Sequence, residues 1–182
     1  MITTIVAEQC RRVFILVPSD LLRVQTVENC VKLGILKDIG VIEQRVRYPN
    51  VLCLKSQPRT KDELKEMLDS ANIIISTAKL VSRFDIEYMN MLSSKCDVLI
   101  VDEAHHIEAN RWNQIKSFFR DKRILQFTAT PFRNDGKKLD GDIIYNFPLS
   151  MAQEQGYFQK INFKPIIEYD EEKGDYAIAQ AE

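Results

Sequence analysis

Five short runs of consecutive apolar residues divide the chain, at positions 13–17, 51–54, 73–75, 98–101 and 124–127. Each run is nearly continuous in its hydrophobic character and does not alternate between apolar and polar residues. A strand that is buried on both faces has this character, and such strands are typical of parallel sheets covered by helices. The pattern therefore predicts five buried strands, with helices in the segments between them.

Helical patterns fill those segments. Thr60 and Glu63 are spaced as a capping box, and Ser150 and Gln153 predict a shorter helix that Gly156 ends. Apolar residues at helical spacing predict three buried faces. These faces consist of Leu64, Met67, Leu68 and Ala71, of Trp112, Ile115 and Phe119, and of Val24, Val27 and Val31. The alternation of strands and helices predicts an α/β domain whose mostly parallel sheet has helices on both faces.

Composition and charge describe an ordinary globular protein. Of its 182 residues, 45% are hydrophobic and 28% are charged. The 25 Lys and Arg against 26 Asp and Glu give a net charge of −1, so any nucleic-acid contact must be local. No apolar run approaches the ~20 residues of a membrane span, and the first residues lack a basic leader. A cytoplasmic protein without a membrane partner is expected.

The four cysteines, at positions 10, 30, 53 and 96, lie far apart and have no paired histidine nearby. This spacing argues against a thiolate metal site and against a disulfide scaffold. Reduced and mostly buried thiols are expected.

The segment 98–106 combines a buried strand with two adjacent carboxylates, Asp102 and Glu103. Ligands of open α/β sheets bind at the carboxyl ends of the strands, which is where this pair emerges. One carboxylate there can hold the water shell of Mg²⁺, and the other can take a proton from an attacking water. A solvated strand end is the alternative, because Asp-Glu pairs are common on protein surfaces.

A second strand exit carries hydroxyl groups. The run 124–127 leads into the string Thr-Ala-Thr-Pro-Phe-Arg, with Thr128 and Thr130 as its hydroxyl residues. At this point the sequence resembles the superfamily-two helicases and translocases. The string Asp-Glu-Ala-His at 102–105 looks like their motif II (Walker B), and 128–130 looks like motif III. The doubled histidine and the longer string resemble the type III restriction (ResIII) branch more than the DEAD-box RNA helicases.

The resemblance implies roles for these residues. Asp102 holds Mg²⁺ through water and Glu103 activates the water that attacks the γ-phosphate of ATP, with His105 beside them. Thr128 and Thr130, together with His105, couple the nucleotide state to the nucleic-acid groove. For His106, packing against the following helix and a catalytic role both stay open as interpretations. For Trp112, a place in the core is a better interpretation than stacking on a base.

Two upstream segments resemble motifs that contact the nucleic-acid backbone. The segment 17–25 is similar to motif Ia and includes Pro18 and Gln25, and the segment 75–80 is similar to motif Ib and includes Ser76 and Thr77. An ordinary strand-to-helix turn is the alternative for the first of them. Contacts of this kind position a nucleic acid without reading its sequence.

The phosphate-binding loop G-x-x-x-x-G-K-[ST] does not occur in the sequence. The resemblance therefore implies that residues 1–160 are an incomplete first RecA-like domain with the P-loop NTPase fold, whose own phosphate loop precedes residue 1. Residues 162–169 could form a further strand, and 161–182 are expected to be the domain end or a linker toward a second RecA-like domain.

The function expected from the resemblance is an ATP-dependent motor. The complete protein would use ATP and Mg²⁺ to move along or unwind nucleic acid, DNA rather than RNA, with restriction or repair subunits as candidate partners. The isolated chain is expected to be inactive, because one domain without a phosphate loop lacks the cradle for the triphosphate. The alternative is a non-enzymatic, degenerate helicase module that only binds nucleic acid or a protein partner.

Overall fold

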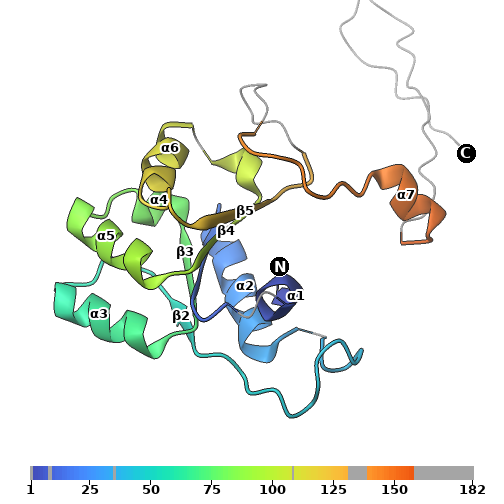
Figure 1. Ribbon diagram of the computed structural model, residues 1–182, viewed down its shortest axis with the longest axis horizontal. Helices are drawn as coiled ribbons and strands as arrows, with labels where there is room; N and C mark the ends of the chain where they lie inside the picture. The colour runs from blue at the N-terminus through green and yellow to red at the C-terminus, as the bar shows by residue number, and fades with distance from the viewer. Residues whose placement is uncertain (1, 8–9, 35, 108, 131–138, 158–182) are drawn as a thin grey trace, which may run out of the picture. The chain divides into compact units, whose positions relative to one another are not determined.

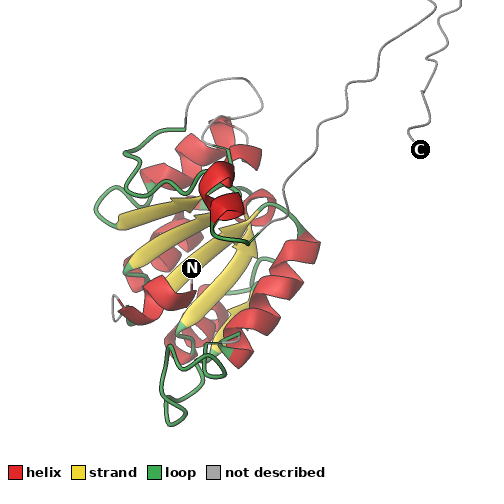
Figure 2. Cartoon of the chain, turned by 90° about the vertical axis from the view of Figure 1, so that its right-hand side faces the viewer, coloured by secondary structure: helices red, strands yellow, loops and turns green. Residues whose placement is uncertain are grey.

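A computed structural model describes residues 2–7, 10–34, 36–107, 109–130 and 139–157. They fall into two compact units, Met1–Asp140 and Gly141–Glu182. The first unit is built on a five-stranded sheet of order β2-β3-β1-β4-β5 in which every pair is parallel (Figures 1 and 2). Its strands are β1 (Val13–Val17), β2 (Val51–Cys53), β3 (Ile73–Thr77), β4 (Val98–Asp102) and β5 (Arg123–Phe127).

The sheet confirms the prediction made from the apolar runs. Every residue of β1 and β3 is buried, because helices cover both faces of these central strands. The edge strands β2 and β5 are only half-buried along most of their length. Since all strands run the same way, their carboxyl ends meet at one edge of the sheet. That edge holds the predicted chemistry.

Helices α3, α4, α5 and α6 lie on one side of the sheet, and α1 and α2 lie on the other (Figure 1). Their bounds are α1 (Ile2–Ala7), α2 (Asp20–Lys32), α3 (Lys61–Ser70), α4 (Ala78–Val81), α5 (Ile86–Lys95) and α6 (Ala109–Ser117), with a 3₁₀ turn at Ala104–His106. The predicted capping box begins α3: the Thr60 hydroxyl accepts from the Glu63 N–H at 3.1 Å. The Glu63 carboxylate reaches back one residue further than the motif requires, to the Arg59 N–H at 2.7 Å.

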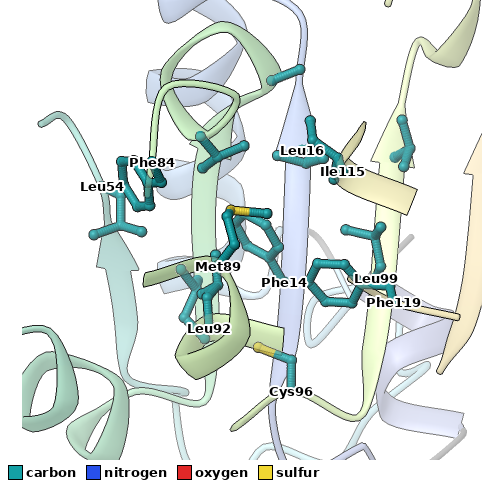
Figure 3. Close-up of a cluster of buried hydrophobic side chains, with 14 of the residues drawn as sticks. Phe14, Leu16, Leu54, Phe84, Met89, Leu92, Cys96, Leu99, Ile115 and Phe119 are labelled. Carbon is teal, nitrogen blue, oxygen red and sulfur yellow. The ribbon is translucent and has the colours of Figure 1, made fainter. Parts of the chain in front are cut away.

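The larger core cluster fills the side under α3–α6. Phe14 of β1 stacks on Phe119 with ring centroids 6.0 Å apart, and both rings are fully buried (Figure 3). Trp112 and Ile115 belong to the same cluster, so the helix face predicted from their spacing is confirmed. Replacing a ring such as Phe119 with alanine in a core of this kind costs about 3–5 kcal/mol.

The predicted buried face of α2 is wrong at two of its three positions, because only Val27 packs against the core. Val24 and Val31 are 46% and 45% exposed, and α2 buries Arg23, Thr26 and Cys30 instead. The buried face is thus shifted by about one position from the prediction. The Arg23 side chain on it is only 10% exposed, and its Nε is buried without a hydrogen bond. The Arg23 guanidinium there pairs with Asp20 at 2.9 Å.

Arg12 ties three elements together at the amino edge of the sheet. Its guanidinium donates to the Ala71 carbonyl at 3.0 Å, beyond the end of α3, and to the Lys95 carbonyl at 3.1 Å, at the end of α5. Its backbone N–H donates to the Asp97 carboxylate at 2.9 Å. Carbonyls at a helix end lack intrahelical partners, so one side chain satisfies two helix ends at once.

No disulfide joins the four cysteines, all of which lie in the described part of the chain. Burial raises the pKa of the Cys30 thiol to about 11 and that of the Cys96 thiol to about 12. Both thiols therefore stay protonated at neutral pH and behave as small core residues.

In the second unit, the described residues before the short helix α7 (Leu149–Glu154) form neither a helix nor a strand. The predicted capping role of Ser150 is wrong, because Pro148 occupies the N-cap position and Ser150 already lies inside the helix. Gly156 follows with φ +77°, the left-handed conformation that suits glycine after a helix. The strand expected at 162–169 lies outside the described residues.

Candidate functional site

The carboxyl ends of β4 and β5 bring the two sequence motifs side by side. Asp102, the last residue of β4, is in register with Phe127, the last residue of β5. Glu103 and Thr128 therefore leave the sheet at the same level, although 25 positions separate them in the sequence. The register alone places the carboxylate pair next to the hydroxyl string.

Asp102 is half-buried at this edge. Burial raises the pKa of its carboxyl group above the usual aspartate range, and the neighbouring charge of Glu103 raises it further. Both effects disfavour the ionised form. A nearby cation would oppose both of them, so the carboxylate pair is electrostatically suited to one.

Glu103 has a backbone conformation that few residues adopt. With φ 49° and ψ 51° it lies in the left-handed helical region, where a side chain crowds its own carbonyl and costs roughly 1–2 kcal/mol. Its carbonyl accepts the His106 N–H at 2.9 Å, which starts the 3₁₀ turn. Strain of this kind gathers at functional sites, where the surrounding structure fixes a side chain in a required place.

His105 links the two motifs. Its Nδ1 lies 2.7 Å from the Thr128 hydroxyl oxygen and 3.4 Å from a carboxylate oxygen of Glu103. The Thr128 hydroxyl donates to the Thr130 carbonyl at 2.6 Å, so its oxygen accepts from His105 and Nδ1 carries the hydrogen. That single hydrogen is directed at Thr128, which leaves the Glu103 oxygen Oε2 buried without a hydrogen bond. Hydrogen bonds thus run from His105 through Thr128 to Thr130, and the Glu103 carboxylate lies beside the start of this chain.

The residues at this edge fit a hydrated divalent cation. Among the described residues, no group of three or more His, Cys, Asp or Glu side chains could hold a metal ion alone. Mg²⁺ does not need such a group, because it keeps several waters and takes one or two carboxylates together with phosphate oxygens. The orphaned Oε2 of Glu103 and the raised pKa of Asp102 are what a missing positive charge would leave behind.

The residues predicted to contact nucleic acid separate into two groups. Pro18 is half-buried just beyond β1, and Gln25 is exposed in the second turn of α2. Ser76 is fully buried, and its hydroxyl donates to the Leu54 carbonyl at 3.4 Å. Thr77 is 5% exposed, and its hydroxyl accepts the Leu80 N–H at 3.3 Å. Because β3 extends through Thr77, both hydroxyl groups are buried and engaged within the chain, and a nucleic-acid contact at these two residues stays a prediction.

Exposed cations occupy that part of the edge instead. Lys55 and Arg59 follow β2 and, with Ser56 and Gln57, line a cavity of about 230 Å³. Lys79 is exposed directly after β3. Among the described residues, none of these three side chains has an ion-pair partner. Two cations flanking a proline just after a predicted strand are the signal that could have identified Lys55 and Arg59.

Two other predictions concern single side chains near the site. Trp112 is 4% exposed within the larger cluster, in agreement with a core role. His106 is exposed and its ring lies 4.0 Å from that of His105, so the expected packing against the following helix is wrong. Positions 131–133 of the predicted motif III string lie outside the described residues.

In the part of the chain that the structure describes, no helix has the length and apolar character needed to cross a membrane.

Comparison with known proteins gives a family match. The sequence model of the family described as "Type III restriction enzyme, res subunit" matches residues 1–133. The transcription-repair-coupling factor of Staphylococcus aureus (strain USA300) is 29% identical over 126 residues, which is 66% of this chain and 9% of that protein. The chain thus spans about a tenth of that relative's length. The crystal structure of the UvsW helicase from bacteriophage T4 aligns at a TM-score of 0.43 and 16% identity, over 68% of this chain and 39% of that one.

Proposed function

The chain belongs to the family of the type III restriction enzyme res subunit, and from this premise we propose that it forms part of an ATP-dependent helicase or translocase motor. Residues 1–160 contribute an incomplete first RecA-like domain, and 161–182 lead toward a second one. DNA is the preferred substrate over RNA, because the family is named for a restriction enzyme and a relative for transcription-repair coupling. Restriction or repair subunits are the corresponding partners.

In this proposal the two carboxylates divide the chemistry. Asp102 holds Mg²⁺ through its water shell, in line with a carboxyl group whose pKa is raised by burial and by a neighbouring charge. Glu103 takes the proton from the attacking water, since its strained backbone fixes a carboxylate oxygen that no hydrogen bond occupies. ATP with Mg²⁺ supplies, when bound, the γ-phosphoryl group that this water attacks.

The observation that carries the proposal is the contact between His105 and Thr128. The 2.7 Å bond joins the turn that positions Glu103 to the turn that follows β5. A surface Asp-Glu pair has no need of such a bond, and a solvated strand end does not explain a left-handed glutamate. A motor needs this connection, because the state of the nucleotide must reach the segment that moves with the nucleic acid.

The nucleic acid is proposed to run along the same edge of the sheet. Lys55, Arg59 and Lys79 supply positive charge near the ends of β2 and β3, and Gln25 supplies an exposed amide on α2. Three cations can neutralise three phosphates, which is enough for weak and sequence-independent binding by a chain whose net charge is −1. Backbone contacts of this sort hold a strand in place while the motor moves it.

The edge at β5 supports the view that the domain is incomplete. Within the described residues β5 pairs only with β4, so it is an edge strand of the described sheet. Leu125 and Phe127 stay half-buried there, whereas every residue of β1 is fully buried. A further strand in a longer protein would cover this edge and complete the layer next to the site.

The test is the replacement of His105 by alanine in the full-length protein. The expected result is that single-stranded DNA no longer stimulates phosphate release while basal release persists, because the link from Glu103 to Thr128 is cut. His106→Ala is the matched control, since its side chain has no bond to Thr128 and stimulation should survive. Unchanged stimulation in His105→Ala, or equal loss in both variants, would overturn the proposed linkage.

A further inference from the structure

We propose that the cavity at the amino edge of the sheet is a second site, which binds one nucleotide unit, either free or within a single strand. The cavity measures about 610 Å³ and is lined by residues of α1, of the starts of β1 and β3, and of the segment before β2. It lies at the end of the sheet opposite to Asp102, because all five strands are parallel. The inference does not depend on the proposed motor function.

Positive charge is the first feature of this cavity. Arg11, Arg12 and Arg47 line it, and none of its lining residues is acidic. The Arg12 guanidinium is already engaged with the backbone carbonyls beyond α3 and α5. Within the described residues the guanidinium groups of Arg11 and Arg47 have neither a hydrogen bond nor an ion pair, so both remain available for an anion.

The carboxylate next to these arginines is Asp97. It accepts the backbone N–H groups of Arg11 and Arg12 at 3.0 and 2.9 Å. Those two bonds hold its charge at the start of β4 and leave the two free guanidinium groups unpaired. Two guanidinium groups that line one cavity match a phosphate group, which such groups bind through paired N–H donors.

An aromatic ring held in place is the second feature. Tyr48 lines the cavity and is 60% exposed, and the Lys37 ammonium lies 3.9 Å from its ring centroid. Lys37 itself is only 9% exposed, and its ammonium donates to the carbonyls of Gln44 and Val46 at 3.0 and 2.7 Å. A buried lysine therefore fixes both the loop and the ring. One face of the ring is covered by Lys37, which leaves the other for stacking.

The rest of the cavity suits a base. Ile5, Leu33 and Ile73 are buried hydrophobic residues that form an apolar wall, and Asn72 contributes an amide. The Asn72 side-chain oxygen accepts the Asn50 N–H at 3.0 Å, so its amide N–H groups are the donors left for a ligand. Size agrees as well, since small-ligand sites measure roughly 300–1,000 Å³. A phosphate on the arginines and a base against Tyr48 use all of these features together.

The experiment is a calorimetric titration of the 182-residue chain without Mg²⁺, which removes the cation that a triphosphate at Asp102 would need. One arm uses 5′-AMP, with adenosine for comparison, and the other uses a short oligothymidylate. We expect AMP to bind and adenosine to bind at least about tenfold more weakly, because charged hydrogen bonds to the phosphate are lost.

Variants connect the binding to this cavity. Arg47→Ala and Arg11→Ala should each weaken AMP about tenfold or more, while Arg45→Ala should leave it unchanged because Arg45 does not line the cavity and pairs with Glu43. The titration measures binding at the end of the sheet opposite to Asp102 and not phosphate release, so failure of this site and failure of the proposed motor can be told apart.

Each result decides the proposal. Binding of the oligonucleotide alone, with the same dependence on Arg47, supports the site and identifies a single strand as the source of the nucleotide. The proposal is overturned if neither ligand binds, if adenosine binds as well as AMP, or if binding is indifferent to both arginine variants.

Discussion

Replacing Glu103 with glycine should make the isolated chain more stable than replacing it with alanine. The residue has φ 49° and ψ 51°, a conformation in which any side chain crowds the backbone. Relief of that crowding raises the free energy of unfolding by roughly 1–2 kcal/mol. The greater freedom of glycine in the unfolded chain lowers it again by about 0.5–1 kcal/mol. The glycine variant is therefore expected to exceed the alanine variant by about 0.5–1 kcal/mol in free energy of unfolding.

The comparison is between glycine and alanine because both remove the same carboxylate. Each variant also ends the repulsion that raises the pKa of Asp102, so this effect cancels in the difference. The difference that remains in the free energy of unfolding comes from the backbone conformation at this position. A glutamate in ordinary helical conformation gives the opposite sign, and Glu66, exposed in the middle of α3, is the matched control. There glycine should be less stable than alanine by about 1 kcal/mol.

Urea unfolding followed by circular dichroism, with Trp112 fluorescence as a second probe, measures all four variants. Coincident transitions from the two probes establish that the two-state treatment applies. If Glu103→Gly proved no more stable than Glu103→Ala while the Glu66 pair behaved as expected, the backbone at Glu103 would not be strained. Backbone strain would then not hold this glutamate in place for chemistry.

Two further changes test the electrostatics and the framework. Asp102→Asn should raise the free energy of unfolding at neutral pH, because ionising a carboxyl group whose folded-state pKa is raised destabilises the fold. This gain should disappear as the pH falls below the usual aspartate pKa, where the carboxyl group is protonated in both states. Urea midpoints measured across pH would show it. Arg12→Ala should lower the free energy of unfolding by about 2–4 kcal/mol, since it leaves the carbonyls of Ala71 and Lys95 without their donor. Arg12→Lys should recover little of this loss, and full recovery by lysine would show that charge rather than the planar fork matters.

The sheet could be predicted from the sequence because its strands are buried on both faces. Short continuous apolar runs such as 73–75 are typical of buried strands, and a chain of this size has one core in which to bury them. The face of α2 could not be predicted in the same way. Arg23 and Thr26 lie inward there while Val24 lies outward, and only the packing of a whole helix against the sheet decides between two such faces.

In the candidate site, too, some features could be predicted from the sequence and others could not. The types of Asp102, Glu103 and Thr128 and their places after strands were readable from the sequence. The bond between His105 and Thr128 was not, because it depends on the pairing of β4 with β5 and on the left-handed turn at Glu103. Ser76 and Thr77 differ from these residues, because their position in the sequence suggested exposure and the structure buries them.

Those two hydroxyl residues lie at a strand exit in the sequence, yet the strand extends through both of them and buries their hydroxyl groups. Local sequence cannot specify where a parallel strand stops, since that depends on the length of its neighbours. The cavity at the amino edge was equally hidden, because its lining comes from five separate segments.

The central claim is that the edge carrying Asp102 and Glu103 hydrolyses ATP in a nucleic-acid motor. It is tested most directly by phosphate release from ATP, measured for the full-length protein and its Glu103→Gln variant with saturating single-stranded DNA. The amide keeps the shape of the side chain but cannot take a proton from water, so the variant should still bind ATP and lose turnover. Turnover within a few-fold of the unaltered protein would contradict the account, because the carboxylate would then have no part in the reaction.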